Sequence, residues 1–130
     1  MAAKSKVLIV DDDSDYSEAI KLLLEKKGGY DVVLAYDGCE GIEKVKSERP
    51  DIIVLDVMMP LKDGYTMCAE LKADEKYRDI PIILLTAVAS HIAETQYTPR
   101  MGMETEAEDY LEKPVAPKLI LEKIDKLLKK

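Results

Sequence analysis

The hydrophobic pattern of the chain begins with four successive apolar residues at 7–10, most of them β-branched. Such a run is typical of a strand that is buried on both faces, as the strands of parallel sheets are. Apolar runs at 32–35 and 82–85, an apolar run at 52–55 that ends on Asp56, and a shorter segment at 109–112 indicate four further strands.

The segments between the expected strands carry apolar residues at helical spacing. The first helix is expected to be capped by Ser14 or Asp15. It is expected to end at 28–29, because glycine readily adopts the left-handed conformation that closes a helix. The apolar faces of the other helices are marked by Ile42 and Val45, by Met67, Leu71 and Ala73, and by Leu119, Ile120, Ile124, Leu127 and Leu128.

Strands and helices alternate five times along the chain, with short connections between most of them. That alternation predicts an α/β fold with a parallel sheet covered by helices on both faces. The least regular part is 87–108, which we interpret as a short, broken or loosely packed helix. At 130 residues the chain has the size of one domain. Residues 1–130 are therefore expected to form a single domain without an appended output domain.

Composition narrows the functional classes. The formal net charge of −7 argues against direct nucleic-acid binding, which needs clustered Lys and Arg. No apolar run approaches the roughly 20 residues that cross a bilayer, and the short polar N-terminus is unlike a signal peptide. Cys39 and Cys68 stand far apart, without the spacing of a metal site or a disulfide framework. We therefore expect a cytoplasmic protein with no membrane or nucleic-acid partner.

Carboxylates follow two of the expected strands at the point where each strand ends. Three aspartates at 11–13 come directly after the first strand, and Asp56 ends the third. Because ligands of open α/β sheets bind at the carboxyl ends of strands, these side chains are expected to converge if the two strands are neighbours. Like charges about 4 Å apart repel by roughly 4 kcal/mol at an effective dielectric near 20, so the cluster requires a cation. Lys113 is one candidate and a divalent metal is the other; an all-oxygen cluster suits Mg²⁺ or Mn²⁺.

The acidic loop also has features of two other kinds of site. Asp11, Asp13 and Asp15 alternate as in a calcium-binding EF-hand loop. Tyr16, however, stands where that loop requires glycine, and Leu22 stands where it requires a bidentate glutamate, so an EF-hand is excluded. The threonine or serine and the lysine of haloacid-dehalogenase-type phosphatases are not ordered here in the way of that family. We interpret Asp13 as a solvated loop residue or a helix cap.

Four motifs stand in order along the chain. They are Val10-Asp11-Asp12-Asp13, the segment 51–60 followed by Asp63-Gly64, Ile80-Pro81-Ile82-Ile83 before Thr86-Ala87, and Asp109-Tyr110-Leu111-Glu112-Lys113-Pro114. The ordered set resembles the receiver domain of two-component response regulators, in particular single-domain regulators of the chemotaxis type, over nearly the whole chain. The resemblance implies a flavodoxin-like fold, a doubly wound five-stranded parallel sheet in the order 2-1-3-4-5.

The resemblance also implies a Mg²⁺ site at the carboxyl ends of the strands. Asp12 and Asp56 would ligate the ion directly, and the backbone carbonyl of Met58 would add a third protein ligand. Asp11 would act largely through a coordinated water.

Asp56 is, by the same resemblance, the phosphoacceptor, a carboxylate nucleophile that forms an aspartyl phosphate. Lys113 would hold a phosphate oxygen by a charge-assisted hydrogen bond. The Thr86 hydroxyl would do so after moving towards the site, with help from the backbone N–H of Ala87. The space that Thr86 vacates would admit the ring of Tyr110, which makes Tyr110 the expected switch residue.

These roles imply a phosphoacceptor signalling protein of a two-component phosphorelay. It would be no enzyme beyond its own phosphorylation and dephosphorylation. The donor would be a sensor histidine kinase or a histidine phosphotransfer protein. An effector of unknown identity, or a second copy of the chain in a homodimer, would bind after phosphorylation. Met58 and Val88 offer no polar group to orient an attacking water, which predicts slow self-hydrolysis.

Two departures from the family pattern leave other functions open. The stretch from Thr86 to Lys113 is longer than usual by roughly one helical turn and contains Pro99. Val115 stands where an aromatic residue often follows Lys-Pro. The alternatives are a phosphorylation-independent interaction or dimerisation scaffold, and a phosphate sink without an output.

Overall fold

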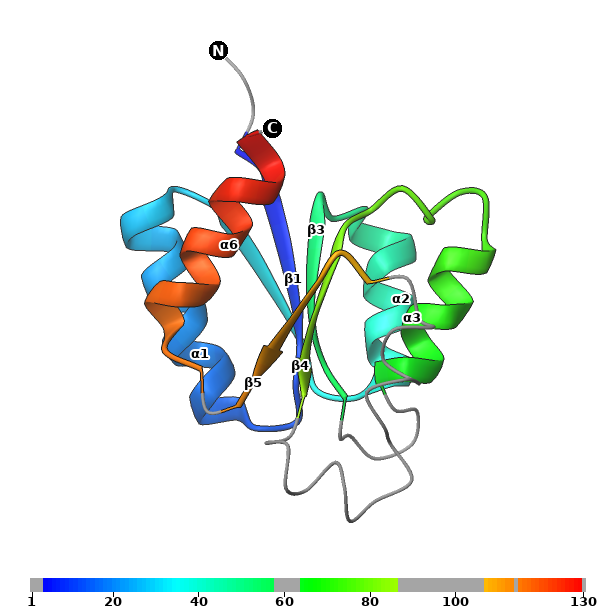
Figure 1. Ribbon diagram of the computed structural model, residues 1–130, viewed down its shortest axis with the longest axis horizontal. Helices are drawn as coiled ribbons and strands as arrows, with labels where there is room; N and C mark the ends of the chain where they lie inside the picture. Colours follow the sequence, from blue (N-terminus) through cyan, green and yellow to red (C-terminus); the bar gives the residue numbers. More distant parts are fainter. Residues whose placement is uncertain (1–3, 58–63, 87–106, 114, 130) are drawn as a thin grey trace.

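The computed structural model describes residues 4–57, 64–86, 107–113 and 115–129, and it shows a five-stranded sheet between two layers of helices (Figure 1). All neighbouring strands pair in parallel, in the order β2-β1-β3-β4-β5. The α/β fold class and the strand order are therefore confirmed. The strands are β1 (Lys6–Val10), β2 (Asp31–Ala35), β3 (Ile52–Asp56), β4 (Ile82–Thr86) and β5 (Asp109–Glu112).

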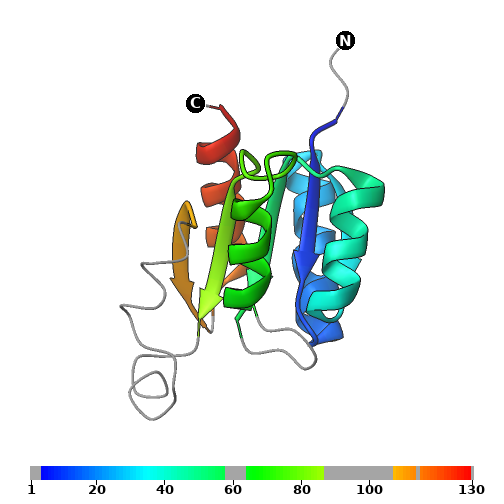
Figure 2. The ribbon, with the colours of Figure 1, turned by 90° about the vertical axis from the view of Figure 1, so that its right-hand side faces the viewer.

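In the described part of the chain, α-helices cover both faces of the sheet. Helices α1 (Ser14–Leu23) and α6 (Pro117–Lys129) lie on one face, and α2 (Gly38–Glu48) and α3 (Gly64–Ala73) lie on the other (Figure 1). When the molecule is turned, α2 and α3 stand in front of the sheet and α6 lies behind it (Figure 2).

Both faces of the central strands are buried, which explains their uninterrupted apolar sequence. Along β3, Ile53 and Leu55 pack into the core shared with α2 and α3. Ile52 and Val54 pack into the core shared with α1 and α6. Because successive side chains point to opposite faces of a strand, each short run anchors both helical layers. This packing holds the carboxyl ends of β1, β3 and β4 side by side at one edge of the sheet.

The first helix differs from its expected start. Its cap is Asp13 and not Ser14 or Asp15, since the Asp13 carboxylate accepts a hydrogen bond from Tyr16 N at 3.1 Å. Asp13 has the extended backbone that a cap needs (φ −87°, ψ 100°), whereas Ser14 is already helical. The interpretation of Asp13 as a helix cap is therefore confirmed.

The fifth strand is joined to the sheet by a polar contact at its beginning. Glu108 N donates a hydrogen bond to Ile82 O at 2.9 Å, and Ile82 N donates to the Glu108 carboxylate at 2.7 Å. The same carboxylate accepts from Lys72 Nζ of α3 at 2.9 Å. These bonds set the register in which β5 leads towards Lys113. Of the segment 87–108, interpreted from the sequence as a short, broken or loosely packed helix, only 107 and 108 are among the described residues, so that interpretation stays a prediction.

A tyrosine links the end of the first helix to the last one. A π-helical turn, η1 (Leu24–Gly28), continues α1 and ends at Gly29, whose φ of 70° is the left-handed conformation expected there. The Tyr30 hydroxyl then donates a hydrogen bond to the Asp125 carboxylate of α6. Burial, this bond and the negative charge of Asp125 all raise the pKa of Tyr30.

Phenylalanine in place of Tyr30 is expected to lower the free energy of unfolding near pH 8 by about 1–2 kcal/mol, because a hydrogen bond to a charged group is lost. The difference is expected to narrow as the pH rises above about 10, the ordinary pKa of tyrosine. There the unfolded native chain releases the Tyr30 proton while the folded chain keeps it, so this contribution to stability declines. Urea unfolding of both proteins from about pH 8 to about pH 10.5 measures the difference. A difference that does not change with pH would contradict the assignment.

Candidate functional site

Three carboxylates meet at the carboxyl ends of β1 and β3. The two strands are neighbours, and the pairing of Val10 with Leu55 places Asp11 beside Asp56. Ligand oxygens of Asp11, Asp12 and Asp56 all lie within 4.8 Å of one another. Asp11 and Asp56 are buried, whereas Asp12 is exposed. The structure therefore brings together the three side chains that the sequence predicted to converge.

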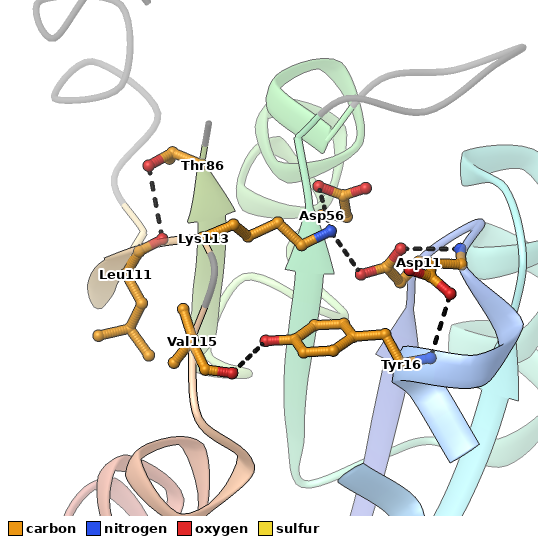
Figure 3. Close-up of polar contacts among 8 residues, drawn as sticks. Asp11, Tyr16, Asp56, Thr86, Leu111, Lys113 and Val115 are labelled. Carbon is orange, nitrogen blue, oxygen red and sulfur yellow. Dashed lines mark hydrogen bonds and ion pairs between the residues drawn. The ribbon is translucent and has the colours of Figure 1, made fainter. Parts of the chain in front are cut away.

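Lys113 reaches this cluster from the end of β5, the edge strand of the sheet. Its backbone N–H donates to Thr86 O at 2.8 Å, which extends the pairing of β4 and β5 by one residue. The side chain then crosses towards β3 and β1 (Figure 3), where Nζ lies 3.0 Å from Asp11 Oδ2 and 3.5 Å from Asp56 Oδ1. One ammonium balances only one of three carboxylates, so the cluster keeps a surplus of negative charge.

The surroundings of Lys113 favour its charged form. Burial is the largest single influence and lowers the pKa of Lys113, but the hydrogen bond to Asp11 and the negative charges of Asp56 and Asp11 outweigh it. The net effect raises the pKa above the ordinary value for lysine. The side chain therefore stays a cation at neutral pH and can pair with an anionic group.

The three successive aspartates divide their roles through local geometry. Asp13 N donates to Asp11 Oδ1 at 2.9 Å, which leaves the other Asp11 oxygen to Lys113. The Asp13 carboxylate turns away to cap α1. Asp12, between them, is exposed and contributes its oxygen at the open side of the cluster.

Glycine at position 64 allows the chain to pass close to the end of β3. Gly64 N donates to Val57 O at 2.9 Å. A Cβ at this position would collide with Asp56 O and lie 2.8 Å from Val57 Cα, both backbone atoms that cannot move aside easily. The sequence showed Gly64 only as part of the Asp63-Gly64 motif, without this steric role. Only the tertiary packing of α3 against the end of β3 shows why the residue is glycine.

Of the other predicted site residues, Thr86 lies at the same edge of the sheet, Tyr110 lies further back along β5, and the rest lie outside the described residues. Thr86 is buried at the end of β4, and its hydroxyl donates to Leu111 O at 3.4 Å, away from the carboxylates (Figure 3). Tyr110 lies on β5 and is 36% exposed. Met58 and Ala87 are not among the described residues, and Val88 is not either. Their predicted roles remain predictions.

The donor set fits Mg²⁺ by its chemistry and its size. It consists of carboxylate oxygens, the ligands that this ion prefers. Oxygens that bind one Mg²⁺ directly at about 2.1 Å lie at most about 4.2 Å apart. The oxygens of Asp12 and Asp56, within 4.8 Å of each other, need at most a slight closure, and Asp11 can act through a coordinated water. The exposed position of Asp12 leaves room for the waters that Mg²⁺ usually keeps. The residues present can therefore hold the ion.

One residue at the site was overlooked by the sequence-based reasoning. From the sequence, Tyr16 served only to exclude an EF-hand. In the structure its ring lies beside Lys113, with the ring centroid 5.1 Å from Nζ. Its position in the first helix gave no hint of a contact with a lysine far along the chain.

Within the described ranges, no helix is long and apolar enough to cross a membrane.

Comparisons with known proteins agree with this fold and identify its family. A family model described as the response regulator receiver domain matches residues 7–125. The DNA-binding dual master transcriptional regulator RpaA of Synechocystis sp. is 38% identical over 125 residues, which are 96% of this chain and 49% of that protein. The chain thus spans about half the length of this curated relative.

Solved structures show the same similarity. The chemotaxis response regulator CheY4 of Vibrio cholerae is 27% identical, with a TM-score of 0.82 and coverage of 96% of this chain and 99% of that chain. The receiver domain of the sensor histidine kinase PA1611 from Pseudomonas aeruginosa PAO1 is 29% identical, with a TM-score of 0.82 and coverage of 98% of this chain and 100% of that chain. That structure holds a magnesium ion coordinated in the active site cleft.

Proposed function

Because the chain belongs to the response regulator receiver domain family, we propose that it takes up a phosphoryl group on Asp56 with the help of Mg²⁺. Receiver domains are signalling modules of two-component systems and not classical enzymes, and phosphorylation and Mg²⁺ binding are characteristic of the family. The observation that carries the proposal is the convergence of Asp11, Asp12, Asp56 and Lys113 at one edge of the sheet.

The proposed reaction is an in-line transfer in which an Asp56 oxygen attacks phosphorus and the bond to the donor's leaving group breaks. Phosphoryl transfer asks the protein mainly for positioning and for electrostatic stabilisation. Asp11, Asp12 and Asp56, with the Met58 carbonyl as a further expected ligand, would hold the Mg²⁺. When bound, the ion would neutralise negative charge on the acceptor and on the phosphoryl oxygens. Lys113, already 3.5 Å from Asp56, would donate a hydrogen bond to one of those oxygens.

The proposed switch starts at Thr86. Its hydrogen bond to Leu111 O is long, at 3.4 Å, so the hydroxyl loses little by turning to a new anionic acceptor. A phosphoryl oxygen on Asp56 would be such an acceptor. Tyr110, on the strand next to Thr86, would then turn inward and alter the surface around β5. Through such a change the domain would pass the signal to its effector.

The proposed phosphoryl donor is a sensor histidine kinase or a histidine phosphotransfer protein. The relative from Synechocystis is described as DNA-binding, but this chain matches only about half of that protein. The effector is therefore left as a protein partner, or a second copy of the chain, that recognises the phosphorylated surface. The scaffold alternative depended on the lengthened stretch between Thr86 and Lys113, of which the structure describes only 107–112, so nothing specific favours it over phosphorylation.

Incubating the native chain with acetyl phosphate and Mg²⁺ is expected to add the mass of one phosphoryl group per molecule. Peptide mapping is expected to locate that group on Asp56. Chelation of Mg²⁺ is expected to prevent the uptake, because the surplus negative charge of the cluster then repels the incoming phosphate. Intact-mass spectrometry measures each result. No uptake by the native chain, or uptake that chelation leaves unchanged, would overturn the proposal.

A further inference from the structure

Tyr16 of α1 contacts the segment after β5 at two points. Its ring lies beside the Lys113 ammonium, 5.1 Å from centroid to Nζ, and its hydroxyl donates to Val115 O at 2.8 Å (Figure 3). The tyrosine therefore contacts both Lys113 and the buried Val115.

The contacts around Tyr16 form a closed circuit through the acidic cluster. Lys113 Nζ donates to Asp11 Oδ2 at 3.0 Å, and Asp11 Oδ1 accepts from Asp13 N at 2.9 Å. Asp13 in turn caps α1 by accepting from Tyr16 N at 3.1 Å, and the Tyr16 ring returns to Lys113. Each member is thus held by two neighbours in the circuit. A change at Tyr16 would therefore act on the position of the ammonium.

The environment keeps Tyr16 in the form that makes both contacts. Burial is the largest influence and raises the pKa of Tyr16, and together with the negative charges of Asp11 and Asp56 it outweighs the Lys113 charge and the hydrogen bond to Val115, which lower it. The hydroxyl therefore stays a donor at neutral pH. A lysine ammonium over a tyrosine ring is attracted by the negative face of the ring, more strongly where the pair is partly desolvated.

We propose that Tyr16 is a positioning residue of the phosphorylation site, which holds the Lys113 ammonium near Asp56 through its ring and anchors Val115 through its hydroxyl. Lysine carries a flexible four-carbon stem, and much of its rotamer freedom must be given up before Nζ can serve a phosphoryl oxygen. A side chain that restricts the ammonium in advance lowers that cost at the moment of transfer. The inference rests on the proposed phosphorylation of Asp56.

The test compares two replacements of Tyr16 by their rates of phosphorylation with acetyl phosphate and Mg²⁺. Tyr16→Leu removes the ring and the hydroxyl and is expected to slow the reaction about tenfold, as the loss of about 1.4 kcal/mol would. Tyr16→Phe keeps the ring and is expected to stay within about threefold of the native rate. Tyr16→Met, which fills space without a ring, replaces the leucine variant if urea unfolding shows that the latter is not folded.

A matched control is Tyr30→Leu. Tyr30 is also a partly buried tyrosine whose hydroxyl bonds to a group near α6, but it lies before β2, at the opposite edge of the sheet. Its replacement is expected to lower stability and leave the phosphorylation rate unchanged.

A double replacement separates positioning from a general effect on the fold. In a Lys113→Met background, Tyr16→Leu is expected to cause no further loss of rate, because the ammonium that Tyr16 positions is gone.

In NMR spectra, the upfield ring-current shift expected for the Lys113 side-chain methylenes is expected to vanish in Tyr16→Leu and persist in Tyr16→Phe. An equal loss of rate with and without Lys113, or a native rate in Tyr16→Leu, would overturn the inference. Absence of any phosphate on the native chain would instead overturn the proposed function.

Discussion

Asparagine in place of Asp56 is expected to abolish phosphoryl uptake and, without Mg²⁺, to make the domain more stable. An amide has the shape of the carboxylate but is no nucleophile for phosphorus, so the loss of uptake is expected to be complete. The gain in stability follows from the crowding of Asp11, Asp12 and Asp56 within 4.8 Å, with one lysine among them. Removing one negative charge relieves two repulsions and loses one attraction. We expect a net gain of about 1–3 kcal/mol.

Mg²⁺ is expected to reverse part of this difference, because it binds the folded native cluster and stabilises it by mass action. Urea unfolding of both proteins, with Mg²⁺ and with a chelator, measures the effect, and intact-mass spectrometry measures uptake. Asp79→Asn is a suitable control, since Asp79 is exposed and outside the cluster. A stability of Asp56→Asn below that of the native chain in the chelator would show that the carboxylates are not mutually repelling. Phosphoryl uptake by Asp56→Asn would show that another residue is the acceptor.

Methionine in place of Lys113 is expected to slow phosphorylation by about a hundredfold or more. The loss of one preorganised donor to developing negative charge typically costs this much in rate. The same change is expected to lower the free energy of unfolding by about 2–3 kcal/mol without Mg²⁺, because the fully buried Asp11 loses its ion-pair partner. This is less than the 3–5 kcal/mol typical of a fully buried pair, since Lys113 is itself 28% exposed. Added Mg²⁺ is expected to restore stability in part but not the rate.

Lys123→Met provides the matched control for this prediction. Lys123 lies 3.2 Å from Asp109 and is 30% exposed, close to the exposure of Lys113, but it pairs outside the acidic cluster. Its replacement is expected to leave the phosphorylation rate unchanged. A native rate in Lys113→Met, or an equal loss of rate in Lys123→Met, would contradict the assigned role of Lys113.

Strand positions could be predicted well because they depend on local sequence. The runs that end at Val10 and Asp56 are short, apolar and bounded by polar residues, and both of their faces are buried in the structure. The helix cap was harder to predict. Asp13, Ser14 and Asp15 are all good caps. The choice between them depends on the local backbone, in which Asp13 N donates to the Asp11 carboxylate and Asp13 is the last extended residue before the helix.

The order of the strands came from the family resemblance and not from the hydrophobic pattern, because periodicity identifies strands but not their neighbours. That order decides whether Asp11 and Asp56 meet. Once β1 lies beside β3, the carboxylates converge.

The amino-acid sequence was enough to place acidic groups at strand ends and to offer Lys113, beside a divalent metal, as a candidate counter-charge, since both inferences need only local pattern and charge. The tertiary structure alone decided how these groups share their contacts. In the structure, Asp11 accepts a hydrogen bond from Lys113 and Asp13 caps α1. The Tyr16 ring lies beside Lys113, which is 97 positions away in the sequence. The physical reason is that such contacts depend on the distance between α1 and the end of β5. That distance is set by the packing of both cores and not by any neighbouring residue.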